Sequence, residues 1–380
     1  MNKILQILSC MLAAIVLLIA CKKPYEPPVI KAETNFLVVD GSISCGNNAV
    51  TTITLSRTTR LIDSILFIPE LNAAVSIEQE QGSNFIVAEQ GNGIYSTQPL
   101  NLDPNHKYRL KIRTANNKEY ISEYVAGKTS PAIDSLTWKQ KGDVTVSVNT
   151  HDPSNNTRYY RWEYVETWNY ESIYSTYYGV ENGYIYFKNS PDTQTDSCWR
   201  TANSTNIVLG SSIALSQDVI SNLPVAVVPQ HNERIGKGYS ILVKQYALDR
   251  EVFNYLRLIQ RNTQQLGTLF DAQPSQLKGN IRSSDDPAEP VIGYIIASTV
   301  SEKRIFIRNH QLTDWNFLPS IIFCGTLITI PQNPVDYRIF DYPDLSFGPY
   351  YFITGGLVIA KKQCLECTER GGTNKKPSFW

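Results

Sequence analysis

Short hydrophobic runs alternate with turn residues from residue 35 onwards, a pattern typical of antiparallel β-strands. In residues 50–57 alternate side chains are apolar, so Ile53 and Leu55 face the same side of a strand. About seven or eight such strands fit into residues 35–128. The pattern therefore predicts a mainly β protein whose N-terminal domain is an immunoglobulin-like or transthyretin-like β-sandwich.

One hairpin of this domain is clearly indicated. Residues 107–114 and 119–125 both alternate, and they flank a polar turn at residues 115–118. The apolar side chains of the first strand share one face: Tyr108, Leu110 and Ile112.

A second and larger β-rich domain is predicted for residues 129–380, beginning at a Thr-Ser-Pro boundary. It contains one amphipathic helix at about residues 249–266, with Asp249 as its cap and Gly267 as its end. We expect the helix to pack on a sheet through an apolar face formed by Val252, Tyr255, Leu256, Ile259 and Leu266. Residues 291–299 and 304–308 predict a late pair of strands added to the same domain.

The densest aromatic segment lies between residues 159 and 187. Tyr160, Trp162 and Tyr164 recur at period two and line one face of a strand, whereas residues 168–178 are polar and irregular, as in an exposed loop. Aromatic side chains bind sugar rings and other ligands, but they equally fill β-cores and protein interfaces. The candidate ligand or partner contacts are Trp162, Trp168, Tyr170, Tyr174, Tyr177 and Tyr178.

The N-terminus has the form of a lipoprotein leader. Residues 1–20 carry an apolar run after Lys3 and end in Leu-Ile-Ala before Cys21, which predicts a signal peptide and lipidation of Cys21. An uncleaved membrane anchor is the alternative, although the run is short for a membrane span. Prolines in residues 21–34 exclude a helix there and indicate a stalk. The lipid would anchor the chain to a membrane without spanning it.

Composition narrows the partners. The chain has 35 basic and 35 acidic residues, so it lacks the basic excess that nucleic-acid binding requires. Its 22 Tyr, 13 Phe and 6 Trp favour sheets over helical bundles. We expect no nucleic-acid partner.

Five cysteines follow the predicted anchor, and outside the cytoplasm disulfides persist. We expect Cys45 to remain unpaired and the bonds to form among Cys198, Cys324, Cys364 and Cys367, with the connectivity left open. The Cys364-x-x-Cys367 spacing also occurs in redox and zinc sites, but a second such motif and a nearby His are both missing from the sequence.

The sequence contains no motif for catalysis or for a cofactor, and we predict no catalytic residue, metal site or cofactor. The four histidines are dispersed, and His106 and His151 stand in turn sequences. Asp285, Asp286 and Glu289 form the most acidic patch. Such carboxylates serve glycoside hydrolysis or calcium binding elsewhere, but their loop sequence favours a solvated turn.

Several strings in order resemble a known family. They are Leu55-Ser56-Arg57-Thr58, residues 243–248 ahead of the helix, residues 289–294, and the C-terminal run from Cys364 to Trp380. They resemble the Bacteroidota outer-membrane lipoproteins catalogued as domain of unknown function 4249. The resemblance implies a cell-envelope location and frequent company with TonB-dependent transporters. In that setting Ser64 and Ser135, each in an Asp-Ser-aliphatic triplet, are similar to O-glycosylation sites.

These features predict a lipid-anchored accessory or binding protein of the outer membrane, facing the periplasm or the surface, without catalysis. A TonB-dependent transporter is the expected partner, and the ligand is left open between a glycan and a peptide. The alternatives are a structural or adhesive surface lipoprotein, and a glycan hydrolase using the acidic patch.

Overall fold

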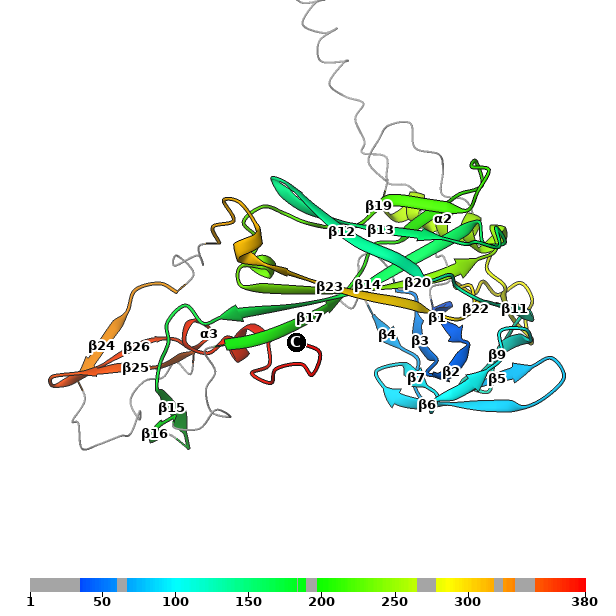
Figure 1. The fold of residues 1–380 in the computed structure, drawn as a ribbon. Coiled ribbons are helices and arrows are strands. Elements are labelled where there is room, and N and C mark those ends of the chain that lie inside the picture. The colour runs from blue at the N-terminus through cyan, green and yellow to red at the C-terminus, as the bar shows by residue number, and fades with distance from the viewer. Residues whose placement is uncertain are drawn as a thin grey trace, which may run out of the picture.

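The computed structural model describes residues 35–59, 67–182, 184–188, 197–264, 278–317, 324–331 and 346–380. The predicted signal peptide, Cys21, the stalk and Ser64 lie outside the described residues. The protein is mainly β, as predicted, and its strands form three regions that follow one another across the molecule (Figure 1).

The first region is a sheet of eight strands that closes on itself, in the order β9, β11, β22, β1, β3, β7, β6, β5 and back to β9. We call it the closed sheet. Its members are β1 (Leu37–Ser44), β3 (Thr52–Arg57), β5 (Ala74–Gln79), β6 (Asn84–Gly91), β7 (Ile94–Ser96), β9 (Lys107–Arg113), β11 (Val125–Lys128) and β22 (Ala297–Ser298). Short strands at its margins are β2 (Gly46–Ala49), β4 (Ile68–Pro69), β8 (Leu100–Leu102), β10 (Glu119–Ser122) and β21 (Ile281–Ser283).

The faces of these strands follow the predicted alternation. Ile53 and Leu55 on β3 are fully buried, as are Tyr108, Leu110 and Ile112 on β9, and β9 and β10 form the predicted hairpin. Their side chains fill the interior of the closed sheet.

The predicted two-sheet sandwich is not the arrangement observed in this region. The two-residue strand β22 pairs in parallel with both β1 and β11, while β11 also pairs with β9, so the strand pairing runs in a complete circuit. Alternation in the sequence fixes which face of a strand is buried, but it carries no information about which edges meet.

Residues 281–298 return to the closed sheet from far along the chain. Ile281, Val291, Ile295 and Ala297 belong to its core, so part of the expected late strand pair lies here and not in the second domain. A boundary at residue 128 therefore leaves out strands that complete the first region.

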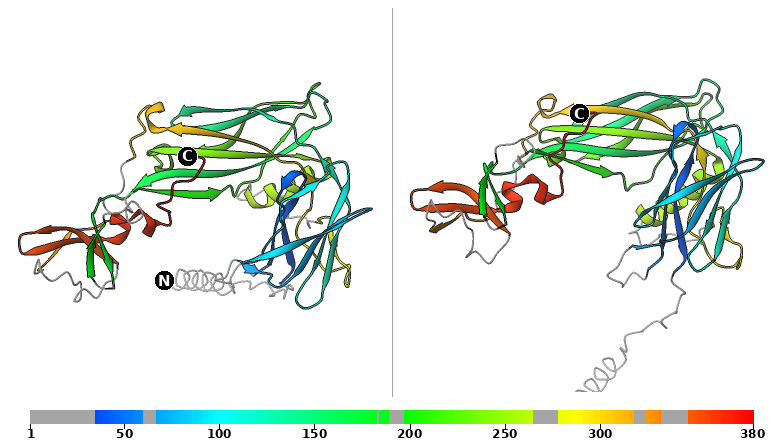
Figure 2. Two further views of the ribbon diagram at one scale, coloured as in Figure 1. Left: turned by 60° about the horizontal axis from the view of Figure 1, so that its bottom comes forward. Right: turned by 90° about the horizontal axis from the view of Figure 1, so that it is seen from below.

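The second region, here called the central sandwich, consists of two sheets packed face to face (Figure 2). One sheet contains β12 (Ile133–Lys141), β13 (Asp143–His151) and β19 (Val219–Val228). The other contains β14 (Tyr159–Glu171), β17 (Ser197–Asn203), β18 (Val208–Ser211), β20 (Gly238–Leu248) and β23 (Ser301–Arg308). Two short 3-10 helices, η2 (Glu233–Ile235) and η3 (Asn309–Gln311), flank the second sheet.

The predicted amphipathic helix is present as α2 (Arg250–Gln264). Val252 and Tyr255 are buried, Leu256 and Ile259 are partly buried, and Arg250 and Arg257 are exposed, as predicted. Phe253, which was not in the predicted face, is buried too, and Leu266 and Gly267 lie outside the described residues. Phe253 packs against Tyr159 of β14 with 5.0 Å between ring centroids. The carboxylate of Asp249, the expected cap, forms an ion pair with Lys128 at 2.8 Å.

The third region, here called the tip, projects from the far end of the central sandwich (Figures 1 and 2). A hairpin of β15 (Tyr178–Glu181) and β16 (Tyr184–Phe187) packs there against a sheet of three strands. The remaining elements are β24 (Ile328–Pro331), β25 (Phe347–Ile353), β26 (Gly356–Lys361), α3 (Lys362–Leu365) and η5 (Cys367–Arg370).

A glycine is required where residues 281–298 cross the closed sheet, and this gives a first prediction. Gly293 has φ +147°, and a Cβ there would lie 2.3 Å from the backbone oxygen of Val39. Gly293→Ala is expected to lower the free energy of unfolding by about 2–3 kcal/mol, through backbone strain and this clash. Chemical denaturation measures the change.

Gly91→Ala is the matched control, because Gly91 also has positive φ (+92°) but nothing lies within 4 Å of its added Cβ. It should lose only about 1 kcal/mol from backbone strain. Equal losses in the two variants would contradict the close approach of Gly293 to β1.

Candidate functional site

A cleft of about 860 Å³ lies between the closed sheet and the central sandwich. We call it the inter-unit cleft. One wall comes from β1, β2 and β3, and the other from β14, β20, the end of β17 and the start of β23. Its volume is at the upper end of the range of about 300–1,000 Å³ usual for small-molecule sites.

We call the wall that the central sandwich contributes the floor of the cleft. The register of three neighbouring strands sets its side chains. Glu163 on β14 lies opposite Lys244 on β20, which in turn lies opposite Glu302 on β23. Two residues further along the strands, on the same face, Arg161 lies opposite Tyr246. Directly opposed residues point to the same face, so these five polar side chains form one patch.

Charges on the floor are paired within the protein. Arg161 forms an ion pair with Glu163, and the Tyr246 hydroxyl donates to the other oxygen of the Glu163 carboxylate at 3.0 Å. Burial and the adjacent Glu163 carboxylate raise the pKa of Tyr246, which keeps its hydroxyl protonated as a donor. Lys244 pairs with Glu302 at 3.3 Å.

The opposite wall is built from the outward side chains of the closed sheet. On β1, Val39 and Ile43 are buried inward, so Asp40, Ser42 and Ser44 point outward. On β3, Thr52 and Thr54 do the same. The wall therefore presents hydroxyl groups and one exposed carboxylate.

Buried contacts fasten the connection between the two regions to the central sandwich. Gln245, fully buried behind the floor, accepts from Trp162 Nε1 at 2.9 Å and donates to the Pro131 oxygen at 2.8 Å and to Thr150 Oγ1 at 3.1 Å. Ser130 donates through its hydroxyl to the Gln245 backbone oxygen at 3.0 Å. Because residues 130 and 131 connect the closed sheet to the central sandwich, these bonds hold the cleft in one shape.

The chain's C-terminal residues lie on the same sheet face, beyond the cleft. Phe379 contacts the Arg304 guanidinium, with 3.6 Å from Cζ to the ring centroid, and Trp380 packs on Phe306 at 5.8 Å. Arg304 is two residues from Glu302 along β23 and lies on the same face, so the C-terminal residues border the polar floor.

Three of the predicted aromatic contact residues are buried and do not face a ligand or partner. Trp162 is fully buried, and Trp168 and Tyr170 are 7% and 4% exposed. The expectation of an exposed loop from residue 168 is wrong for its first part, because β14 continues to Glu171 and pairs there with β17. Long-range pairing made a strand of a segment whose composition suggested a loop.

The other three predicted aromatic residues lie at the tip. Tyr177 is 61% exposed and stacks on Phe187, which is 57% exposed. Tyr178 is partly buried against Phe352, and Tyr174 stacks on Tyr350. The tip thus carries an exposed aromatic surface, to which Tyr184, Tyr186, Tyr351 and Ile353 also contribute.

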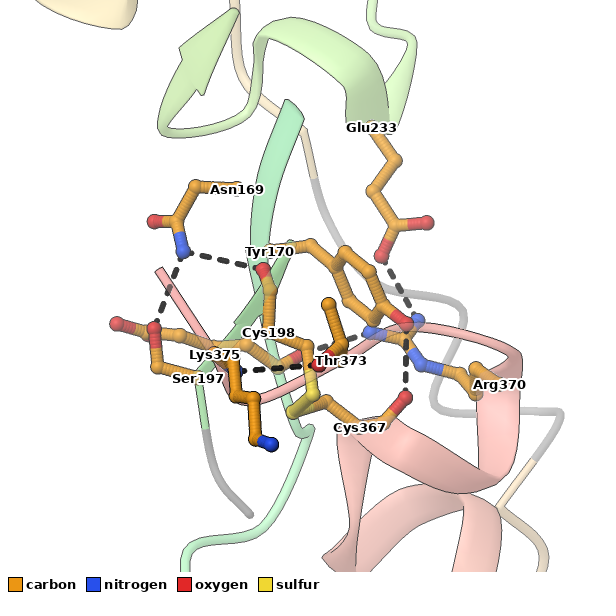
Figure 3. The surroundings of a disulfide bond; sticks show 10 residues. Asn169, Tyr170, Ser197, Cys198, Glu233, Cys367, Arg370, Thr373 and Lys375 are labelled. Carbon is orange, nitrogen blue, oxygen red and sulfur yellow. Dashed lines mark hydrogen bonds and ion pairs between the residues drawn. A yellow bond between two sulfur atoms is a disulfide. The ribbon is translucent and has the colours of Figure 1, made fainter. Parts of the chain in front are cut away.

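All four cysteines of the predicted disulfide set are bonded, as Cys198–Cys367 and Cys324–Cys364. The two cysteines of the Cys-x-x-Cys motif thus pair with distant partners and not with each other. Around the first bond, the Tyr170 hydroxyl donates to the Cys367 oxygen at 2.7 Å, and Arg370 pairs with Glu233 at 2.7 Å (Figure 3). These contacts fasten the C-terminal segment to β14 and β17.

Cys45 is unpaired, as expected, and is buried at the edge of the cleft. Burial, with Asp103 nearby, raises the pKa of its thiol to about 12. The thiol is therefore protonated at neutral pH and is a poor nucleophile.

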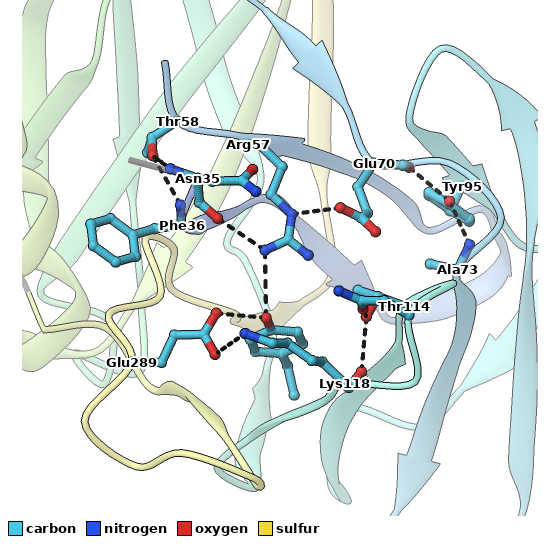
Figure 4. A network of polar contacts seen from close by, with 12 residues as sticks. Asn35, Phe36, Arg57, Thr58, Glu70, Ala73, Tyr95, Thr114, Lys118 and Glu289 are labelled. Atoms are coloured by element: carbon cyan, nitrogen blue, oxygen red, sulfur yellow. Dashed lines mark hydrogen bonds and ion pairs between the residues drawn. The ribbon is translucent and has the colours of Figure 1, made fainter. Parts of the chain in front are cut away.

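The acidic patch does not line the inter-unit cleft. Asp285 and Asp286 are exposed turn residues, as predicted, and accept backbone N–H groups of Glu119 and Ala288. Glu289 differs, because its side chain is only 11% exposed and accepts from the Tyr120 hydroxyl at 2.8 Å and Lys118 at 3.0 Å (Figure 4).

Glu289 belongs to a network at the rim of the closed sheet. Arg57 links the Tyr120 hydroxyl, at 3.5 Å, to Glu70, at 2.5 Å (Figure 4). The three carboxylates of the patch thus serve separate local contacts and do not form the facing pair that glycoside hydrolysis needs.

In the part of the chain that the structure describes, no group of three His, Cys, Asp or Glu side chains is arranged to hold a metal ion. Ser135 lies on β12 and accepts a hydrogen bond from Asn149 at 3.1 Å, and its O-glycosylation stays a prediction.

His151 provides a second testable prediction. A hydrogen bond of 2.8 Å to the Asp134 carboxylate raises the pKa of the exposed His151 ring above 6.5. The bond therefore stabilises the folded protein fully below that pH, and the contribution disappears as the pH rises through the raised pKa. Asp134→Asn should lower the His151 pKa in an NMR titration, whereas Glu89→Gln should not; an unchanged pKa in the first variant would refute the pairing.

The chain belongs to the family described as domain of unknown function DUF4249, whose profile matches residues 22–304. The closed sheet and both walls of the inter-unit cleft fall within this match. The three-stranded sheet of the tip and the cysteines Cys324, Cys364 and Cys367 lie beyond the match, whereas the β15–β16 hairpin and Cys198 fall within it. No curated protein matches the chain. Among the described residues, no helix combines the length and apolar character needed to cross a membrane.

The sequence analysis missed the residues of the inter-unit cleft. The sequence does contain a signal for these residues. Arg161 and Glu163 alternate with the aromatic residues Tyr160 and Trp162, and only the aromatic side of that strand was interpreted. That signal marks a solvent-facing side, but only the folded chain places the closed sheet opposite it.

Proposed function

We propose that this protein is a lipid-anchored accessory protein of the outer membrane that captures a ligand and presents it to a TonB-dependent transporter, without catalysis. The observation that carries the proposal is the inter-unit cleft, a large open site with walls from two regions that buried contacts hold together. A site already formed before binding loses less entropy when its ligand is ordered.

The anchor and the partner rest on the sequence. Cys21 in its lipobox supports lipidation, and the stalk of residues 21–34 supports display of the folded part away from the membrane. The exposed aromatic surface of the tip is the surface we assign to the transporter, since exposed aromatic groups are enriched at interface centres.

Affinity purification of the lipidated full chain from native membranes tests the proposal. A TonB-dependent transporter should be recovered with the wild type, and recovery should fall with Tyr177→Ser/Phe187→Ser at the tip. Phe67→Ser/Ile86→Ser is the control, because it alters exposed apolar residues away from the tip, one beside β4 and one on β6. Absence of any transporter from the wild-type sample would refute the proposed partnership.

Mass analysis of the mature N-terminus tests the anchor separately. The wild type should begin at Cys21 with attached acyl chains, and Cys21→Ser should leave the membrane fraction. Protease treatment of intact cells then decides between a periplasmic and a surface orientation.

A further inference from the structure

We infer that the inter-unit cleft binds a neutral oligosaccharide. The inference rests on the capture role in the proposed function, and it names the class of ligand captured.

The charged groups of the cleft floor favour a ligand without net charge. On the floor, Arg161 pairs with Glu163 and Lys244 pairs with Glu302, so four charged groups already have partners within the protein. A strongly anionic or cationic ligand would have to break these pairs or lie beside a group of its own charge. A neutral polar ligand can use their remaining lone pairs and N–H groups without disturbing them.

The polar groups that line the cleft favour a ligand with many hydroxyl groups. Hydroxyl, amide and carboxylate side chains face each other across it, among them Ser42, Thr54, Asp40 and Asn203. The hydroxyl and amide groups both donate and accept hydrogen bonds, and the carboxylate accepts them. They therefore match a ligand with many hydroxyl groups, and a site of about 860 Å³ accommodates several sugar rings.

A peptide is disfavoured as the occupant of the cleft. Extended peptides bind by adding a strand to an open sheet edge and by placing side chains in apolar pockets. Three of the strands that line the cleft have both edges paired: β1 with β3 and β22, β14 with β17 and β20, and β20 with β14 and β23. The edge strand β23, which pairs with β20, contributes only its start to the wall. Most of the side chains that line the two walls are polar.

The rigid joint behind the floor supports saturable binding. Buried hydrogen bonds from Gln245 and Ser130 hold the connecting residues 130 and 131 against the central sandwich, so the floor is in place before a ligand arrives. Ordered polar groups of this kind gain more from each hydrogen bond because less side-chain freedom is lost.

Calorimetric titration of the purified full chain tests the inference, in a zwitterionic detergent without a sugar headgroup. The probes are neutral tetra- to hexasaccharides built from glucose, xylose or mannose, with oligogalacturonates and uncharged hexapeptides as comparison ligands. We expect saturable binding of at least one neutral oligosaccharide, and weaker binding of both comparison classes.

Two variants with matched controls locate the site. Thr54→Trp, which places a bulky side chain in the cleft, and Lys244→Ala/Glu302→Ala should each weaken binding about tenfold or more, by occlusion or by loss of hydrogen-bonding partners. Ser76→Trp, on the outer face of β5, and Lys107→Ala/Glu80→Ala, a similar exposed pair at 3.4 Å, should bind like the wild type. Thermal unfolding of every variant confirms that it is folded.

Binding of no neutral oligosaccharide, tighter binding of the acidic sugar or the peptide, or undiminished binding by folded Thr54→Trp would overturn the inference. Recovery of a transporter in the affinity purification, together with tight binding of the peptide, would leave the proposed function standing and remove only the ligand class.

Discussion

Loss of the Cys198–Cys367 disulfide is expected to lower the free energy of unfolding by about 5 kcal/mol, the chain-entropy value for so long a loop. The two cysteines are separated by 169 residues, and the bond restricts the unfolded chain over that distance. Cys198→Ala/Cys367→Ala, measured by guanidinium unfolding without reductant, provides the test.

Two further variants are the controls for this result. Cys324→Ala/Cys364→Ala removes the bond with a separation of 40 residues, and should cost about 1 kcal/mol less. Cys45→Ala removes a buried thiol outside any disulfide and should cost about 1 kcal/mol. A smaller effect from the longer loop than from the shorter one would contradict the entropic explanation.

The same bond should protect the C-terminal segment from proteolysis. This segment pairs with Trp199 through a backbone bridge at Thr373. It contains Lys375 and Lys376, the residue type after which trypsin cleaves. Without the disulfide, this segment retains the bridge and the packing of Phe379 and Trp380, which we expect to be too little to keep it in place. Trypsin should then cleave there faster in Cys198→Ala/Cys367→Ala than in the wild type.

Gln245→Leu is expected to lower the free energy of unfolding by about 4 kcal/mol. The change keeps the size of the side chain but leaves the Trp162 N–H, the Pro131 oxygen and the Thr150 hydroxyl without their Gln245 partner in a buried site. A buried polar group left unpaired costs about 1–3 kcal/mol each. Denaturant unfolding measures the loss.

Gln90→Leu is the control for this change, because Gln90 is exposed and its amide makes one long bond of 3.3 Å to the Ala88 oxygen. It should change the free energy of unfolding by no more than about 0.5 kcal/mol. If Gln245→Leu were as mild as Gln90→Leu, the joint between the two regions would not depend on this network.

A second variant at the same position connects the joint to binding, and thermal unfolding first establishes that the variant is folded. Gln245→Glu retains the acceptor for Trp162 Nε1 but removes the amide donor to Pro131 and Thr150. If the joint fixes the cleft, oligosaccharide affinity should fall in this variant although no cleft-lining side chain has changed.

The direction of side chains within each element follows from the amino-acid pattern alone. This pattern placed Ile53 and Leu55 in a core, gave Tyr108, Leu110 and Ile112 a common face, and identified the amphipathic helix and the four bonded cysteines. Periodicity and residue chemistry suffice for these features because each is a property of one short segment. The family, too, was recognisable from short strings in order.

Only the tertiary structure decided which segments meet. Residues 297 and 298 close a sheet that begins at Leu37, Trp162 is covered by a second sheet, and Cys367 pairs with Cys198 and not with its near neighbour Cys364. The contacts of residues 297 and 298 and of Cys367 join positions more than 100 residues apart, and the burial of Trp162 depends on the packing of two sheets. The stability of these contacts comes from packing that no local pattern encodes. For the same reason the inter-unit cleft appeared only when Glu163, Lys244 and Glu302 lay in one row opposite the outer face of β1.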